Sequence, residues 1–301
     1  MNPSGAQPCA VSPGPAVGRP TPGVSERHTV GPVSTDDLDP HSGSFYRPLG
    51  HGRYQPTLHV QGAWQPHEQH MAPVSGLLMH AVDQHEPRDG MQAARLSFEI
   101  LGMIPAEVSE ISVRTVRPGR TIELVEATLA VDGRTVVRAS VWRLSRQDTS
   151  AVAGGAPPRM PEPEAMTQWT GSDVWPGGYI AALEFCNGRD NVPGRGQVWI
   201  RTDTTLVEGV TSSPTAAFVG LVDTANGVAT RVGPREWMYP NVDLSIHLYR
   251  QPVSGPVGLD TTVVFGADGV GLTSSTLHDV HGPVGRSEQI LTVRPLPAQG
   301  S

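Results

Sequence analysis

The sequence predicts an α+β fold built from two similar domains, each with one helix packed against an antiparallel sheet. Three observations lead to this prediction. Several segments recur at a nearly constant offset along the chain of 301 residues. Each copy contains one stretch with helical spacing of apolar residues. In each copy, alternating segments separated by turn signals follow that stretch.

The internal repeat is the observation that decides the fold class. Four pairs of segments match in the same order: GRYQPTLHV from Gly52 with GRGQVWIRT from Gly194 (offset 142), APVSGLLMHAVD from Ala72 with SPTAAFVGLVDT from Ser213 (offset 141), LSFEIL from Leu96 with LSIHLY from Leu244 (offset 148), and AVDGRTVVRASVWR (130–143) with DVHGPVGRSEQILTVR (279–294). The growing offset places a short insertion in the second copy, around REWMYPN.

Each copy is expected to contain one helix after its first strand. Apolar residues recur at helical spacing in 74–81 and again in 217–222. Pro73 and Pro214 each stand in the first turn, where proline is favoured, and Ser213 is a good N-cap for the second helix.

The segments after each helix have the period-two pattern of strands with one buried face. In NVDLSIHLYR, which begins at Asn241, the apolar Leu244, Ile246 and Leu248 alternate with polar residues. The dipeptides Asp132-Gly133 and His281-Gly282 indicate hairpin turns.

Composition sets the domain boundaries. Residues 1–43 are rich in Pro, Gly and Ser and are expected to form a disordered extension. Residues 149–174 have the same character and are expected to be a linker between domains at 44–148 and 175–296, with a short tail at 297–301.

Charge and composition exclude several function classes. The net charge of −7 argues against nucleic acid or an anionic membrane as the main partner. All 22 basic residues are Arg, which excludes Schiff-base lysines and P-loops. Two cysteines, no secretory signal and no apolar run of about 20 residues predict a cytoplasmic protein without a membrane span.

Known cofactor and catalytic motifs are missing. HEQH (67–70) lacks the H-E-x-x-H spacing of zinc sites, and GADGVG lacks the G-x-G-x-x-G pattern of dinucleotide loops. No G-x-S-x-G nucleophile elbow occurs. We therefore expect neither a metal nor an organic cofactor.

Residues 45–296 resemble the double-hotdog acyl-CoA thioesterases of the thioesterase II-like group. HMAPVSGLLMHAV, NVDLSIHLYRQP and GLTSSTLHDVHGPVGRSEQILTVRP carry the resemblance. It implies two tandem hotdog domains, an acyl-CoA substrate, hydrolysis to a free acid and CoA, and a place in fatty acid metabolism. Pairing of subunits through exposed sheet edges is left open.

The resemblance also implies a catalytic Asp, Gln and Thr that together orient a water against the thioester carbonyl. Asp243 and Gln289 stand at the Asp and Gln positions. At the offset of 148 their counterparts are Arg95 and Val141, so the polar pair belongs to the second copy alone. The Thr position, around 266–268, holds no Thr. Thr262 is our substitute candidate, with Thr261 and Asp268 as alternatives.

Other residues are candidates for substrate contact. His70 and Pro73 begin the first helix, Ser213 begins the second, and free N–H groups in either first turn could bind the oxyanion. Trp237 lies in the inserted loop and could border an acyl pocket. Loose candidates for the CoA phosphates are Arg114, Arg117 and Arg294.

Two alternative functions stay open at this point. A hotdog protein that lost the third polar residue could bind acyl-CoA or another lipid without catalysis. A hotdog hydratase or dehydratase is disfavoured, because no Asp–His pair stands at a helix start with a family-like signature.

Overall fold

The computed structural model describes residues 38–296, and strands are the main regular elements of this range. The first repeat contributes β1 (Ser44–Gly50), β2 (Arg53–Pro56), β3 (Met91–Ile100), β4 (Ser109–Arg117), β5 (Ile122–Val131) and β6 (Arg134–Ser145). The second contributes β7 (Thr167–Trp169), β8 (Glu184–Asn187), β9 (Arg195–Arg201), β10 (Thr205–Val207), β11 (Trp237–Met238), β12 (Asp243–Leu248), β13 (Val257–Phe265), β14 (Val270–Asp279), β15 (Gly282–Thr292) and β16 (Arg294–Pro295).

Helices are few within residues 38–296. The α-helices are α1 (Met71–Gln84), α2 (Gly178–Ala181), α3 (Pro214–Val222) and α4 (Ala225–Val228). The 3₁₀ turns are η2 (Leu58–Val60), η3 (Ser150–Val152), η4 (Pro163–Ala165) and η5 (Gly171–Asp173). In this range no helix is both long and apolar enough to cross a membrane.

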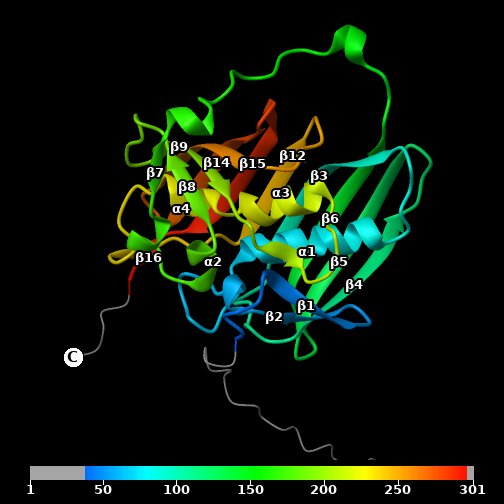
Figure 1. Cartoon of the computed structure of the whole chain (residues 1–301), viewed down its shortest axis with the longest axis horizontal. Helices are drawn as coiled ribbons and strands as arrows, with labels where there is room; N and C mark the ends of the chain where they lie inside the picture. Colours follow the sequence, from blue (N-terminus) through cyan, green and yellow to red (C-terminus); the bar gives the residue numbers. More distant parts are fainter. Residues whose placement is uncertain (1–37, 297–301) are drawn as a thin grey trace, which may run out of the picture. The chain divides into compact units, whose positions relative to one another are not determined.

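One continuous sheet joins the two repeats (Figure 1). Its order is β10-β1-β2-β4-β5-β6-β3-β12-β15-β14-β13-β9-β8-β7, and the repeats meet where β3 pairs antiparallel with β12. Ser97 and Ser245, which are equivalent at the offset of 148, face each other there with their hydroxyl oxygens 3.2 Å apart. The repeats are therefore related by a local pseudo-twofold axis through this strand pair.

The two main helices lie side by side and antiparallel against the inner face of the sheet (Figure 1). Their buried side chains include Leu77 and Leu78 of α1 and Phe218 and Val219 of α3. Gly76 and Gly220 stand where the helices cross, and the Ser75 hydroxyl donates to the Val219 carbonyl at 3.0 Å. Small residues let the helix backbones approach closely, and this brings the start of α1 next to the end of α3.

Gly76→Ala is expected to lower the free energy of unfolding by about 1–3 kcal/mol, although Ala has the better helix propensity. A methyl group at Gly76 would lie 2.7 Å from the Gly220 Cα and 3.0 Å from the Ala216 carbonyl oxygen, so the helices must separate. Urea unfolding followed by circular dichroism measures the change. Gly233→Ala is the matched control, since no atom lies within 4 Å of a methyl group there; equal effects at the two positions would contradict the explanation.

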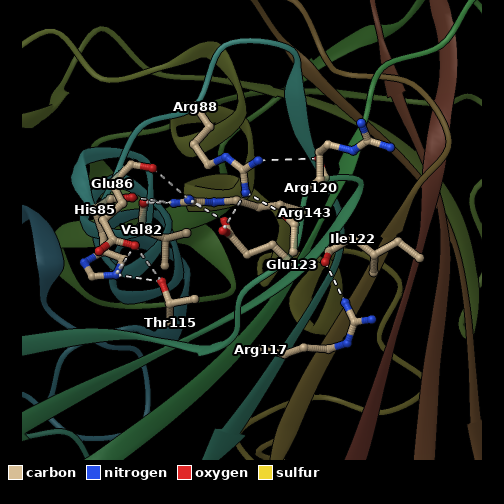
Figure 2. Close-up of polar contacts among 11 residues, drawn as sticks. Val82, His85, Glu86, Arg88, Thr115, Arg117, Arg120, Ile122, Glu123 and Arg143 are labelled. Atoms are coloured by element: carbon tan, nitrogen blue, oxygen red, sulfur yellow. Dashed lines mark hydrogen bonds and ion pairs between the residues drawn. The ribbon is translucent and has the colours of Figure 1, made fainter.

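The end of α1 is closed by a buried ion pair between Arg143 and Glu123 (Figure 2). The Arg143 guanidinium donates to Glu123 at 3.0 Å and to the carbonyl oxygens of Val82 and His85 in the last turn of α1. Arg88 contacts Glu123 from the other side at 3.1 Å. Arg143 thus caps the terminal carbonyls of the helix and neutralises a carboxylate that is only 3% exposed.

Most of the expected secondary structure is confirmed. Both helices and both hairpins form, and Asp132 and Gly133 take the positive φ angles, 48° and 71°, of a tight hairpin turn. The expected linker differs at its end, because β7 lies inside it and pairs with β8 at the sheet edge. Residues 1–37 and 297–301, which hold most of the predicted extension and tail, lie outside the described residues.

Candidate active site

A cavity of about 410 Å³ lies where the start of α1 meets the end of α3. Much of its wall is aromatic and aliphatic: Trp64, Trp169, Trp175, Ile180, Phe185 and Ile104. Trp64 and Trp175 pack edge to face with ring centroids 5.1 Å apart, which stiffens this wall. A few polar groups converge at one end of the cavity, among them His70, Asp223 and Asn241. An apolar cavity with a small polar cluster is the usual form of a small-molecule site.

Asp223 is the centre of the polar cluster. It is the C-cap of α3 and its side chain is 4% exposed. Its Oδ1 accepts two hydrogen bonds from neutral amides, from Asn241 Nδ2 at 2.7 Å and from Gln289 Nε2 at 2.8 Å. Two fixed donors on one oxygen hold the carboxylate in a single orientation and leave Oδ2 for other partners.

Strand geometry brings the two amides to Asp223. Gln289 lies on the inner face of β15 and is fully buried. Asn241 lies just before β12, bridged to Leu291 of β15, and its Nδ2 also donates to the Asp243 carbonyl at 2.9 Å. The site therefore combines the end of a helix with two neighbouring strands of the second repeat.

His70 approaches the same carboxylate from the first repeat. It is the N-cap of α1, and its Nδ1 accepts the Ala72 N–H at 3.1 Å, so Nε2 carries the ring proton. Its ring packs on Tyr179 with centroids 4.2 Å apart. Burial lowers the pKa of His70 to about 3, so the ring is neutral at ordinary pH. The 3.5 Å approach of Nδ1 to Asp223 Oδ2 is therefore not an ion pair.

The pKa of Asp223 is raised to about 6, mainly because burial removes water from the carboxylate. The hydrogen bonds from Asn241 and Gln289 oppose this rise, and the nearby charge of Asp243 adds to it. A carboxylate with a pKa near neutrality, buried in a cavity and aimed by two amides, has the properties of a general base.

The expected pairing of Asp243 with Gln289 is wrong. The Asp243 side chain lies on the outer face of β12, and its Oδ1 accepts the Ile290 N–H at 2.6 Å. Strand alternation is the reason, because Asp243 shares a face with Ser245 and His247 while Leu244 and Ile246 point inward. Asp243 is a backbone cap at the strand start.

Three further expectations also fail on geometry. Thr262 is exposed on the outer face of β13, so it does not reach the cluster. Ser213 lies at the opposite end of α3, where its hydroxyl donates to Asp83 Oδ2 at 2.6 Å. Trp237 lies on β11, paired with β16, and is not part of the cavity wall.

Of the remaining residues predicted to contact substrate, three lie at or beside the cavity and two lie on β4. His70 lines the cavity, and Pro73 is buried in the first turn of α1 behind it. Arg294 stands on the cavity wall. Arg114 and Arg117 lie on β4, where they bind Glu126 and the Ile122 carbonyl instead.

Sequence reasoning missed Asp223 and Asn241, although signals for both were present. The matched helix segments contain HAVD and GLVD near their ends, so each copy carries an Asp close to the end of its helix, Asp83 and Asp223, one position out of register at the offset of 141. Asn241 begins the segment NVDL, two residues before Asp243, and lines the cavity. Its side chain is a third polar group beside Asp223 and Gln289.

Comparison with known proteins gives a consistent assignment. A family model described as the acyl-CoA thioesterase C-terminal domain matches residues 154–293, and the model of the acyl-CoA thioesterase N-terminal domain matches residues 60–144. No similar sequence was found among curated proteins.

Several solved structures share the fold. A protein with a hot dog fold from Alicyclobacillus acidocaldarius has a TM-score of 0.66 at 15% identity, covering 80% of this chain and 92% of that chain. Acyl-CoA thioesterase II TesB2 from Mycobacterium marinum has a TM-score of 0.59 at 15% identity, covering 84% and 96%. The tesB protein of Mycobacterium avium subsp. paratuberculosis gives 0.59 at 17%, covering 83% and 96%. These similarities confirm the predicted α+β hotdog class.

Proposed function

The chain belongs to the acyl-CoA thioesterase family, and we propose that it hydrolyses acyl-CoA by attack of a water that Asp223 activates. The observation that carries this proposal is the buried Asp223 carboxylate, aimed into the cavity with one oxygen held by Asn241 and Gln289. A thioester hydrolase needs a base for water, a donor for the carbonyl oxygen and an apolar slot for the acyl chain.

The base is Asp223. Its Oδ2 accepts a proton from water as the water oxygen attacks the thioester carbonyl carbon. When the tetrahedral intermediate collapses, the carbon–sulfur bond breaks and the proton passes from Asp223 to the departing thiolate of CoA. No covalent enzyme intermediate forms, and the carboxylate is regenerated for the next turnover.

The donor for the carbonyl oxygen is the Met71 N–H at the start of α1. The Ala72 N–H already bonds to the His70 ring, and Pro73 has no N–H. Among the described residues, Met71 N–H has no hydrogen-bond partner, and Met71 lines the cavity. The positive end of the helix dipole strengthens such a donor for a developing oxyanion.

The acyl chain occupies the aromatic wall around Trp64, Trp175 and Phe185. Arg294, exposed on the wall of the cavity, is the candidate for a CoA phosphate. The cytoplasmic location and the role in fatty acid metabolism stay predictions.

A thiol-release assay over a series of acyl-CoA chain lengths tests the proposed function. Purified protein is expected to release CoA from at least one chain length, with the rate falling for chains too long for a cavity of about 410 Å³. Tryptophan fluorescence, recorded in parallel, reports binding because Trp64 and Trp175 line the cavity. Binding without thiol release from any chain length would replace the enzyme by a non-catalytic acyl-CoA-binding protein.

The pH dependence of kcat/KM should have an ascending limb with a midpoint at about 6, the pKa of Asp223. Below this pH the carboxyl is protonated and cannot accept a proton from water; above it the carboxylate is available. His70, with a pKa lowered to about 3, stays neutral across the range and adds no second limb. Initial rates from pH 4.5 to 8.5, corrected for spontaneous hydrolysis, measure the profile. A flat profile, or a midpoint near the ordinary value for Asp, would contradict the assignment.

A further inference from the structure

The inner face of the second repeat is polar where that of the first is apolar. Five pairs of positions related by the offset of 148 differ in this way. In the second repeat they are Thr261, Thr273, Ser275, Ser287 and Gln289, and the equivalent residues of the first repeat are Val113, Val125, Ala127, Ala139 and Val141, in the same order. The registers also correspond, since Thr273 pairs with Gln289 as Val125 pairs with Val141, and Ser275 with Ser287 as Ala127 with Ala139.

Four of the five differences change shape very little. Thr has nearly the shape of Val, and Ser adds one oxygen to Ala. The first repeat shows that this sheet packs with apolar residues at these places, so packing does not require the hydroxyl groups. Burying a polar group without a hydrogen-bond partner is unfavourable, which means that the second repeat must gain something from these side chains.

Three of these polar groups lack a hydrogen-bond partner in the part of the chain that the structure describes. Thr261 and Ser275 bond to each other at 2.7 Å. Thr273 Oγ1, Ser287 Oγ and Gln289 Oε1 have no hydrogen-bond partner among the atoms of residues 38–296, and the three residues are at most 1% exposed. All three side chains point to the inner face of the same two strands.

Their spacing suits bridging water. Thr273 stands directly opposite Gln289, and residues opposite each other in antiparallel strands have Cβ atoms about 5 Å apart. Ser287 is two residues from Gln289 on the same face, about 7 Å along the strand. One or two waters, each with two or three polar partners, span such gaps and satisfy all three groups.

We propose that Thr273, Ser287 and Gln289 Oε1 bind a small cluster of ordered water behind the active site, and that this cluster positions the Gln289 amide. A side-chain amide can rotate by half a turn and exchange its oxygen and nitrogen. Water donating to Oε1 keeps the oxygen on the far side, so Nε2 continues to donate to Asp223 at 2.8 Å. Thr273 and Ser287 are therefore positioning residues, and their catalytic effect rests on the function proposed above.

A high-resolution crystal structure of the full chain tests the binding of water directly. We expect ordered water within hydrogen-bond distance of Gln289 Oε1 and of at least one of the two hydroxyl groups. The absence of ordered water beside these three side chains, or a direct hydrogen bond between Gln289 Oε1 and either hydroxyl group, would overturn the proposal. This result does not depend on catalysis, so it stands even where no acyl-CoA is hydrolysed.

The positioning role is tested by giving the second repeat the residues of the first, as the double variant Thr273→Val with Ser287→Ala. We expect kcat to fall about tenfold with KM unchanged, and the midpoint of the pH profile to move upward. The upward shift follows because the Gln289 hydrogen bond holds down the pKa of Asp223. Among the described residues, the titratable groups close to Asp223 are His70 at the N-cap of α1, Tyr179 on α2 and Asp243 on β12, and none of them is altered.

The matched control introduces the same groups into the first repeat, as Val125→Thr with Ala139→Ser. It places hydroxyls at equivalent buried positions away from Asp223, so it should lower thermal stability without moving the pH midpoint. If the second-repeat variant gains stability and keeps the wild-type pH midpoint and kcat, the hydroxyls position nothing and that part of the proposal is wrong. A wild-type protein that holds the water but releases no thiol would overturn the proposed function instead.

Discussion

Asp223→Asn is expected to lower kcat by about 10³–10⁴-fold, at the upper end of what loss of a general base usually costs. The variant keeps an oxygen that can accept from Asn241 and Gln289, but it has no group that can take a proton from water. Steady-state thiol release under saturating acyl-CoA measures the effect.

The same variant should remain folded. Its amide nitrogen would replace Oδ2, which lies 3.5 Å from the acceptor Nδ1 of His70, and an N–H donor suits that place better than a carboxylate. The raised pKa of Asp223 means that the native state holds its proton up to about pH 6, whereas the unfolded chain loses it near pH 4. Wild-type stability therefore decreases as pH rises through this window, and the Asn variant should not show that decrease.

Asp243→Asn is the matched control, since Asp243 is the neighbouring acid that the family resemblance had favoured. Its carboxylate accepts the Ile290 N–H on the outer face and acts on Asp223 through its charge alone, so kcat should change less than about threefold. The reverse result, with Asp243→Asn inactive and Asp223→Asn active, would restore the original assignment and exclude the site described above.

These two aspartates also show how far sequence reasoning reached. The repeat, the helices and the strands could be predicted because the period of the apolar residues and the offset between matching segments can both be read directly from the sequence. The choice of Asp243 conflicted with the same alternation: the inward positions of that strand are Leu244 and Ile246, so its odd-numbered residues point outward. Alternation within β12 argued against Asp243, whereas Asn241 lies before the strand, where this alternation does not apply.

The sequence marks Asp223 as an acid at the end of a helix, but it does not show what that carboxylate contacts. Its importance comes from the antiparallel packing of α3 on α1, which places the end of one helix against the start of the other and beside β15. Gln289 could be identified from the asymmetry with Val141, yet its partner lies 66 residues away on another element. A contact of this kind becomes visible only when the tertiary structure is known.

The pseudo-twofold relation of the repeats raises a second question, which is why the two ends of the helix pair carry different polar groups. Asp83, the acid at the end of α1, accepts a hydrogen bond from the N-cap Ser213 of α3. Two residues beyond Val141, the counterpart of Gln289, Arg143 reaches the last carbonyls of α1 and pairs with Glu123. A pocket of about 350 Å³ lies at this end too, but its Asp83 and Arg143 are engaged in contacts that stabilise the fold. At the other end, Asp223 keeps one carboxylate oxygen free of hydrogen bonds from the two amides.

Arg143→Met is accordingly expected to lower the free energy of unfolding by about 3–5 kcal/mol, because Glu123 is left buried without its main partner and α1 loses its terminal cap. Arg88, which also contacts Glu123 but is about one-third exposed, compensates only in part. Urea unfolding measures the loss, and Arg114→Met is the control: its pair with Glu126 is on the surface, where ion pairs contribute less than about 1 kcal/mol. The double variant Arg143→Met with Glu123→Met should recover much of the stability, since it removes the unpaired charge.

The folded fraction of Arg143→Met should keep the wild-type kcat, because a helix of 14 residues, about 21 Å long, separates this ion pair from Asp223. Equal losses for Arg143→Met and Arg114→Met would show that the buried pair has no special part in holding α1, and a large fall in kcat would show that the two ends of the helix pair are coupled.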